Sequence, residues 1–187
     1  MTGSAPPPLP ADDKDWTWVL DTVCPECGFD AHTIEREAVG TLLRENIGAW
    51  QTVLTGDDDR LRQRPDSDHW SALEYACHVR DVYRIYDERL ELMLVEDGPH
   101  YPNWDQNVTA VDDRYDLADA ATLADELAAA GERLAERFDD VDDEQWTRTG
   151  YRSDGAAFTI DSFARYFIHD PIHHLDDVTK GYARLQD

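Results

Sequence analysis

The sequence predicts an all-α protein: a bundle of four long helices with an N-terminal extension and a long connection between the second and third helices. Apolar residues recur every three or four positions in four separate segments, while no segment alternates convincingly as a strand would. One connection, residues 99–117, is long and contains two prolines and three aromatic residues. A chain of 187 residues with this pattern fits a single domain.

The chain begins with MTGSAPPPLPADDKD, residues 1–15, which is rich in proline and small polar residues. Such a segment cannot bury enough apolar surface to order itself, so we expect a flexible tail. A single helical domain is expected over residues 16–187. Its first long helix is predicted over residues 33–54, where apolar side chains recur at helical spacing, and the acidic TGDDDR that follows ends it.

The second helix is predicted from its start signal. Ser71 and Glu74 have the spacing of a capping box, in which each side chain binds the backbone N–H of the other residue. The helix is expected to run to about Glu96, because a Gly-Pro pair at 98–99 breaks the pattern. His78 falls on its apolar stripe.

The long connection is expected to cover a pocket, since its aromatic residues and prolines do not suit a slack linker. Within it, PNWDQN supplies Trp104, Asp105 and Asn107 as candidates for lining that pocket, although such residues also cap helices. The third helix is predicted over residues 119–138. The fourth is predicted from Ile160 to about Lys180.

Composition excludes several classes of function. The net charge of −24 would repel nucleic acids and anionic membrane surfaces, so neither is an expected partner. No apolar run approaches the roughly 18 residues needed to span a bilayer, and no secretory signal is visible, so a cytoplasmic protein is expected. Three cysteines argue against a secreted disulfide framework. No phosphate-binding loop or nucleophile elbow appears.

The stretch IHDPIHHLDDV, residues 168–178, contains two pairs of candidate ligands at helical spacing. Asp170 and His174 are four residues apart, as are His169 and His173, so each pair would share one face of the last helix. A helical wheel places the first pair at the edge of the apolar face and the second on the flank away from it. Pro171 leaves the second pair open, because a proline kink could rotate His169 inward.

Together with His78 on the second helix, Asp170 and His174 would make a three-ligand site for a divalent metal inside the bundle. Two imidazoles and one carboxylate leave coordination positions open for water or substrate, as a catalytic site requires. We expect zinc, with nickel, manganese and iron as alternatives.

These residues give the chain a resemblance to the DinB/YfiT-like superfamily over roughly residues 33–182. The resemblance is carried by WSALEYACHVRDV, residues 70–82, and HDPIHHLDDV, residues 169–178. It implies an up-down-down-up four-helix bundle of the DinB type, with His78 as the first ligand and His174 as the last. Most relatives are expected to carry a histidine where this chain has Asp170, and some a carboxylate. His169 with His173 stays open as the alternative pair.

The N-terminal CPECGFDAH offers a second candidate for metal binding. Cys24, Cys27 and His32 have the spacing that begins a zinc knuckle, but Glu37 stands where a fourth ligand would be expected. We therefore expect a segment packed on the bundle with reduced thiols; no thioredoxin-like pattern surrounds it to support a redox role. Cys77 is expected to be a buried, inert thiol.

The resemblance implies a metal-dependent enzyme of the thiol S-transferase or isomerase type, acting on small electrophiles with a low-molecular-weight thiol such as mycothiol as cosubstrate. A metal with open positions could lower the pKa of a bound thiol. Two alternatives stand beside it: a non-catalytic metal-binding bundle acting in stress response, and a metal-dependent hydrolase in which His169 or His173 moves protons. A homodimer would be common for such a bundle.

Overall fold

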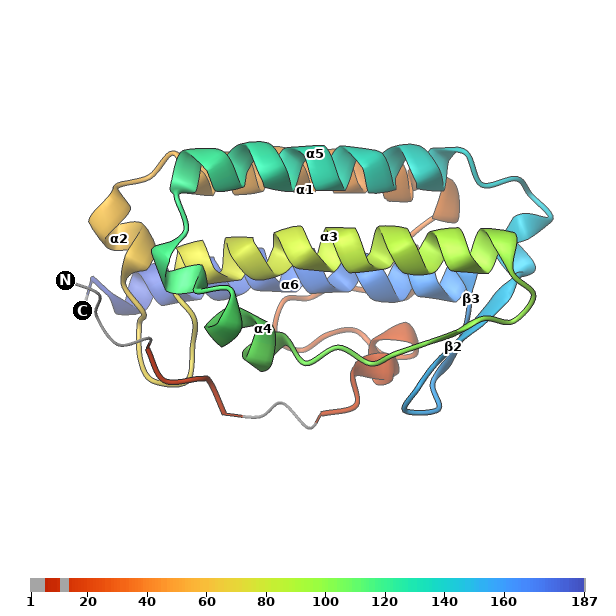
Figure 1. The fold of residues 1–187 in the computed structure, drawn as a ribbon, viewed down its shortest axis with the longest axis horizontal. Coiled ribbons are helices and arrows are strands. Elements are labelled where there is room, and N and C mark those ends of the chain that lie inside the picture. Colours follow the sequence, from red (N-terminus) through yellow and green to blue (C-terminus); the bar gives the residue numbers. More distant parts are fainter. Residues whose placement is uncertain (1–5, 11–13, 187) are drawn as a thin grey trace.

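The computed structural model describes residues 6–10 and 14–186 and confirms the four-helix bundle. Figure 1 shows two layers, with α1 and α5 above and α3 and α6 below. In this view α3 and α5 run from left to right, whereas α1 and α6 run from right to left, which is the up-down-down-up arrangement. The four long helices are α1 (Val39–Leu54), α3 (Ala72–Val95), α5 (Ala120–Asp139) and α6 (Ile160–Arg184).

Shorter elements connect the long helices. They are α2 (Asp58–Arg62), α4 (Gln106–Asp112) and the 3₁₀ turns η1 (Trp16–Leu20), η2 (Ala31–Thr33), η3 (Arg36–Ala38), η4 (Tyr115–Leu117) and η5 (Gln145–Thr147). The predicted start of the first helix at residue 33 was too early, because the chain makes two 3₁₀ turns before α1 begins. The predicted starts and ends of the other three helices lie within a few residues of the observed ones.

The predicted capping box at the start of α3 is confirmed. The Glu74 backbone N–H donates to Ser71 Oγ at 3.3 Å, and the Ser71 N–H donates to Glu74 Oε2 at 2.9 Å. The same carboxylate also accepts from Arg64 Nε at 2.8 Å, and the Glu74 side chain is 4% exposed. The start of α3, nearly two turns before His78, is thereby fixed by a buried ion pair as well as by the cap.

The structure also contains a small sheet, which the sequence, lacking any convincingly alternating segment, did not indicate. Strands β1 (His100–Tyr101) and β2 (Thr149–Arg152) pair in parallel, and β2 pairs antiparallel with β3 (Ala157–Thr159). Strands of two to four residues are too short to show an alternating pattern. The sheet ties the start of the long connection to the hairpin that leads into α6.

The N-terminal segment packs along the bundle beside α6 (Figure 1). Predictions for residues 1–5 and 11–13 lie outside the described residues, and the flexibility of the tail stays a prediction. Part of that tail makes contacts: Arg64 Nη1 donates to the Pro7 carbonyl at 2.9 Å, and Asn107 Nδ2 donates to the Pro10 carbonyl at 3.3 Å. Within the described part of the chain, no helix is both long and apolar enough to cross a bilayer.

Candidate metal centre

A large cleft lies between the bundle, the N-terminal segment and the connection after α3. Its volume is about 1760 Å³, and its walls combine aromatic, acidic and basic side chains from all three parts. His78, Asp170 and His174 all line it. The three residues predicted to line a pocket, Trp104, Asp105 and Asn107, do so as well. Asp105 also caps α4 by accepting from the Asn107 and Val108 N–H groups.

The predicted set of three ligands is brought together by α3 and α6. One ligand atom from each of His78, Asp170 and His174 lies within 4.8 Å of the others. His78 Nε2 is 3.4 Å from Asp170 Oδ1, and His174 Nε2 is 3.8 Å from the same oxygen. The i, i+4 spacing on α6 stacks Asp170 below His174, so both face the single histidine of α3.

The hydrogen bonding of this set suits a cation. Among the described residues neither ring nitrogen of His78 has a hydrogen-bond partner, although the residue is fully buried, and Asp170 Oδ1 is also buried without one. Buried polar atoms normally have hydrogen-bond partners, so buried nitrogen and oxygen atoms that lie close together without such partners need an explanation. Two imidazoles and a carboxylate are a donor set for zinc and other divalent first-row metals, and the residues therefore fit such an ion.

The charge states of the set agree with this fit. Burial lowers the pKa of His78, and this effect exceeds that of the negative charge of Asp170, which acts to raise it. A neutral imidazole with a free lone pair is therefore favoured. Burial would raise the pKa of Asp170, but the neighbouring His174 and His78 prevail and hold that pKa below its usual range. The group is therefore an ionised carboxylate between two imidazole rings.

Asp177 orients the last ligand from outside the set. Its Oδ2 lies 2.9 Å from His174 Nδ1. This contact outweighs the effect of burial and lowers the pKa of Asp177, so the carboxylate is ionised and can only accept. The proton of a neutral His174 therefore sits on Nδ1, which leaves the Nε2 lone pair facing Asp170 and His78. Sequence reasoning missed this role, although Asp177 stands three residues after His174 on the same helix.

Loss of this contact is expected to weaken metal binding. Asp177→Ala should lower the affinity for zinc by about 10- to 100-fold, because an unoriented imidazole is a weaker ligand. Asp176→Ala removes the same charge from a neighbouring position that pairs with Lys180 at 2.6 Å, and serves as the control. Competition with a chromophoric chelator measures both affinities. Equal affinities in the two variants would mean that Asp177 acts through charge alone.

Aromatic rings enclose the two histidines. Trp104 stacks on His78 with 5.2 Å between ring centroids and an interplanar angle of 7°, and Trp70 lies 5.3 Å from the same ring. Tyr75 lies 4.9 Å from His174. The Trp104 indole N–H donates to Thr109 Oγ1 at 2.7 Å, which fixes the ring. These rings restrict the imidazoles to one orientation and shield them from water.

The other candidate pair has a different environment from the one predicted. His169 and His173 do lie on the opposite flank of α6, but that flank is covered by the N-terminal segment, so the residues are 4% and 6% exposed. A position on the flank away from the apolar face therefore does not leave these two histidines exposed. Pro171 does not rotate the helix out of register: α6 continues through it, and Asn46 Nδ2 donates to its carbonyl at 3.1 Å.

The remaining candidates are also placed. His32 does not join the two N-terminal cysteines; its Nε2 lies 3.4 Å from the Asp21 carbonyl oxygen, and the residue is exposed. Cys77 is buried, and burial raises the pKa of its thiol to about 12, as an inert thiol requires. The cleft also contains two arginines, Arg89 and Arg152, that sequence reasoning did not single out. No motif surrounds them that could have identified them.

Comparison with known proteins supports the resemblance seen in the sequence. A protein-family model described as the DinB superfamily matches residues 46–178. This range includes the whole of α3 and all three residues of the candidate centre. No curated protein matches the sequence.

Two solved structures share the fold. One is YfiT from Bacillus subtilis, described as a probable metal-dependent hydrolase with an unusual four-helix bundle topology. It is 18% identical in sequence, and the match has a TM-score of 0.76 and covers 82% of this chain and 91% of that one. The other is a mutant of the mycothiol-dependent maleylpyruvate isomerase, 12% identical, with a TM-score of 0.64 over 79% of this chain and 62% of that one. At these identities the likeness concerns the fold alone.

Proposed function

The chain belongs to the DinB superfamily, and from that premise we propose that it is a divalent-metal-dependent enzyme that uses a low-molecular-weight thiol to transform small electrophiles. The observation that carries the proposal is the convergence of ligand atoms from His78, Asp170 and His174 at the wall of a large cleft, where the buried atoms of His78 and Asp170 Oδ1 have no hydrogen-bond partner among the described residues. Three protein ligands leave a divalent ion with positions open to the cleft, which is the arrangement of catalytic rather than structural sites.

Each part of the site has a role in this proposal. His78, Asp170 and His174 would hold the ion, for which zinc is the first candidate and nickel, manganese and iron are the others. When bound, such an ion lowers the pKa of a thiol and supplies a thiolate at neutral pH. Trp104 and Trp70 cover the ligands and exclude water, and Asp177 holds His174 in the required tautomer.

The shape and charge of the cleft favour a cosubstrate larger than a simple thiol. Arg89 lies on α3 eleven residues after His78, about 16 Å along the helix axis. Its side chain is buried in the cleft wall and donates to the Pro102 carbonyl at 2.8 Å, and among the described residues no carboxylate pairs with it. A guanidinium with spare donors would recognise a carboxylate or polyol group at the far end of an extended thiol.

A metal-dependent hydrolase is the second candidate. It is favoured by the fold shared with YfiT, described as a probable metal-dependent hydrolase, and by His169 and His173, which also line the cleft. The two candidates differ in what they consume. A transferase or isomerase needs the thiol, whereas a hydrolase needs only water.

Turnover should depend on both metal and thiol. The zinc-loaded protein is incubated with an unsaturated acid, with and without mycothiol, and loss of the acid is followed by chromatography. We expect chelation of the metal to slow the reaction by at least about 100-fold, because activation of the thiol depends on the ion. Omission of the thiol should have a similar effect. Thiol-independent hydrolysis of ester or amide substrates by the same preparation would favour the hydrolase instead.

A further inference from the structure

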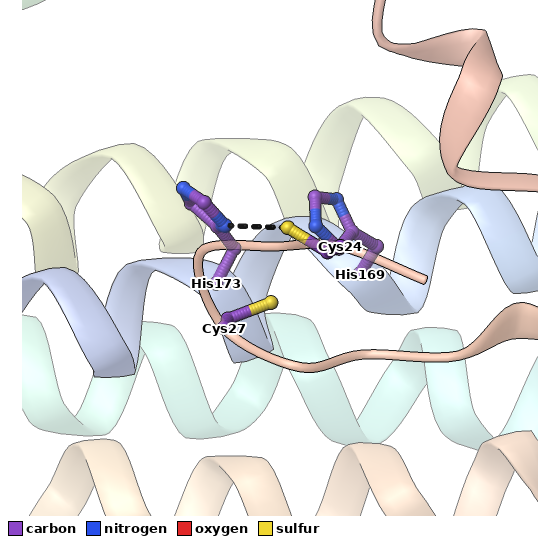
Figure 2. Close-up of side chains that lie close together, drawn as sticks. All are labelled: Cys24, Cys27, His169 and His173. Atoms are coloured by element: carbon purple, nitrogen blue, oxygen red, sulfur yellow. Dashed lines mark hydrogen bonds between the residues drawn. The ribbon is translucent and has the colours of Figure 1, made fainter. Parts of the chain in front are cut away.

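The N-terminal segment presents two cysteines on one tight turn. The Cys24 backbone N–H donates to the Phe29 carbonyl at 2.8 Å, and the Gly28 N–H donates to the Cys24 carbonyl at 2.9 Å. Gly28 has a φ of +76°, in the left-handed region that glycine adopts without strain. The turn brings the sulfurs of Cys24 and Cys27 to the same side, facing α6 (Figure 2).

Two histidines of α6 meet these cysteines. His169 and His173 are one helical turn apart and point toward the turn from the helix (Figure 2). Cys24 Sγ lies 3.7 Å from His173 Nδ1, and one ligand atom from each of the four residues lies within 4.8 Å of the others. Zinc bonds of 2.0–2.3 Å place tetrahedral ligand atoms about 3.3–3.8 Å apart, and the 3.7 Å between Cys24 Sγ and His173 Nδ1 is within that range.

The group is buried and incompletely hydrogen-bonded. Cys24 is 0% exposed, His169 is 4% exposed, and His169 Nε2 has no hydrogen-bond partner among the described residues. Burial, reinforced by the neighbouring His173, lowers the pKa of His169 to about 4, so this imidazole is neutral at physiological pH. All three cysteines are free thiols. The four residues thus supply neutral imidazoles and sulfurs that form no disulfide, and imidazole and cysteine sulfur are preferred ligands of zinc.

We propose that Cys24, Cys27, His169 and His173 bind a second zinc ion, distinct from the ion at His78, Asp170 and His174. Four protein ligands fill a tetrahedral zinc and leave no position for substrate, so this ion is structural. Two thiolates and two neutral imidazoles balance the charge of a divalent ion, which keeps the cost of burying the site low. The ion joins the N-terminal segment to α6.

The surroundings of His173 support this assignment. Its Nε2, the nitrogen that faces away from Cys24, lies 3.5 Å from Glu26 Oε2 and 3.7 Å from Asp177 Oδ2. Carboxylates commonly accept from the second ring nitrogen of a metal-binding histidine. Asp177 also contacts His174, so a single carboxylate lies between the two proposed centres.

The second ion would also shape the cleft. Trp16 lies at a centroid distance of 5.7 Å from His169 and 5.3 Å from His173, and it lines the cleft together with Lys14 and Thr17. A bond between the Cys24 turn and α6 fixes this wall relative to the catalytic candidates. The second ion would therefore affect function by holding this wall of the cleft in place, whatever reaction the first centre performs.

The test uses the full-length protein, reduced and freed of metal, and then titrated with zinc or cobalt. Wild-type protein should bind two equivalents of zinc, and the double variant Cys24→Ser/Cys27→Ser should bind one. His78→Ala should also bind one. Cobalt distinguishes the sites, because a sulfur-to-cobalt charge-transfer absorption should be lost in the double variant and kept in His78→Ala.

Two further variants test whether zinc binding depends on these four residues in particular. His32→Ala should leave the stoichiometry and the cobalt spectrum unchanged, because this exposed histidine lies outside the group. His169→Gln keeps both cysteines and should still lose the second equivalent, which guards against misfolding of the serine variant. The proposal is overturned if cobalt-loaded wild-type protein shows no sulfur-to-cobalt absorption, or if two equivalents of zinc survive in the double variant. Formation of a Cys24–Cys27 disulfide in the presence of excess zinc would also overturn it.

Discussion

His78→Ala is expected to lose the metal of the first centre and, like chelation, to lower turnover by at least about 100-fold, since the ion supplies several kcal/mol of activation. His78 is the single ligand contributed by α3, so its loss leaves Asp170 and His174 on one helix without a partner across the bundle. A two-ligand remnant cannot hold a divalent ion at physiological concentrations. Elemental analysis and turnover, measured on the same preparation, check both expectations.

Because His78 is fully buried, a variant at this position can also disturb folding. Asp170→Ala provides a second test at a side chain that is 34% exposed, and it should lose the same equivalent of metal. His32→Ala removes an exposed histidine and should change neither metal content nor rate. Circular dichroism establishes that each variant is folded. Retention of the first-centre metal by folded Asp170→Ala would rule out the proposed ligand set.

Metal content alone does not separate the two proposed centres, so the variants have to be compared. His78→Ala should keep the ion held by cysteine, and the Cys24→Ser/Cys27→Ser variant should keep the catalytic one. If His78→Ala retains its structural ion but is inactive, the proposed function stands independently of the second site. If the cysteine variant retains both ions, only the second site fails.

The long helices could be predicted because each has several turns of periodic apolar residues and a recognisable start or stop. The capping box at Ser71 is an example: it involves the side chains of two residues three apart, so it is readable in the sequence. The sheet could not be predicted, since β1 has two residues and pairs with a strand about fifty positions later. Such pairing depends on how the connection packs.

The grouping of His78, Asp170 and His174 could be predicted because helical spacing and the apolar stripe of α3 are both local properties. The second group could not be assembled in the same way. The wheel assigned His169 and His173 to an outer flank, and no local signal indicates that the Cys24 turn covers it. The sequence does, however, contain one Cys-x-x-Cys-Gly without a complete set of ligands nearby and one His-x₃-His outside the predicted metal site. Together these two motifs supply the four ligands of a Cys₂His₂ zinc site.

Arg64→Met is expected to destabilise the fold by about 3–5 kcal/mol, because it leaves the Glu74 carboxylate buried without its counter-charge. The Arg64 and Glu74 side chains are 17% and 4% exposed, and the pair fixes the loop before α3, including Trp70, which lies 5.3 Å from the His78 ring. Urea unfolding followed by circular dichroism measures the change in the free energy of unfolding. Metal affinity should fall in the same variant as Trp70 loses its support.

The double variant Arg64→Met/Glu74→Gln separates the pair itself from the unpaired charge. A glutamine can still accept from the Ser71 N–H and carries no charge to bury, so the double variant should be more stable than Arg64→Met alone. Arg133→Met removes an arginine that is 58% exposed and 3.4 Å from Asp87, and should cost less than about 1 kcal/mol. Equal losses in Arg64→Met and the double variant would mean that the arginine contributes packing and its bond to Pro7, rather than charge neutralisation.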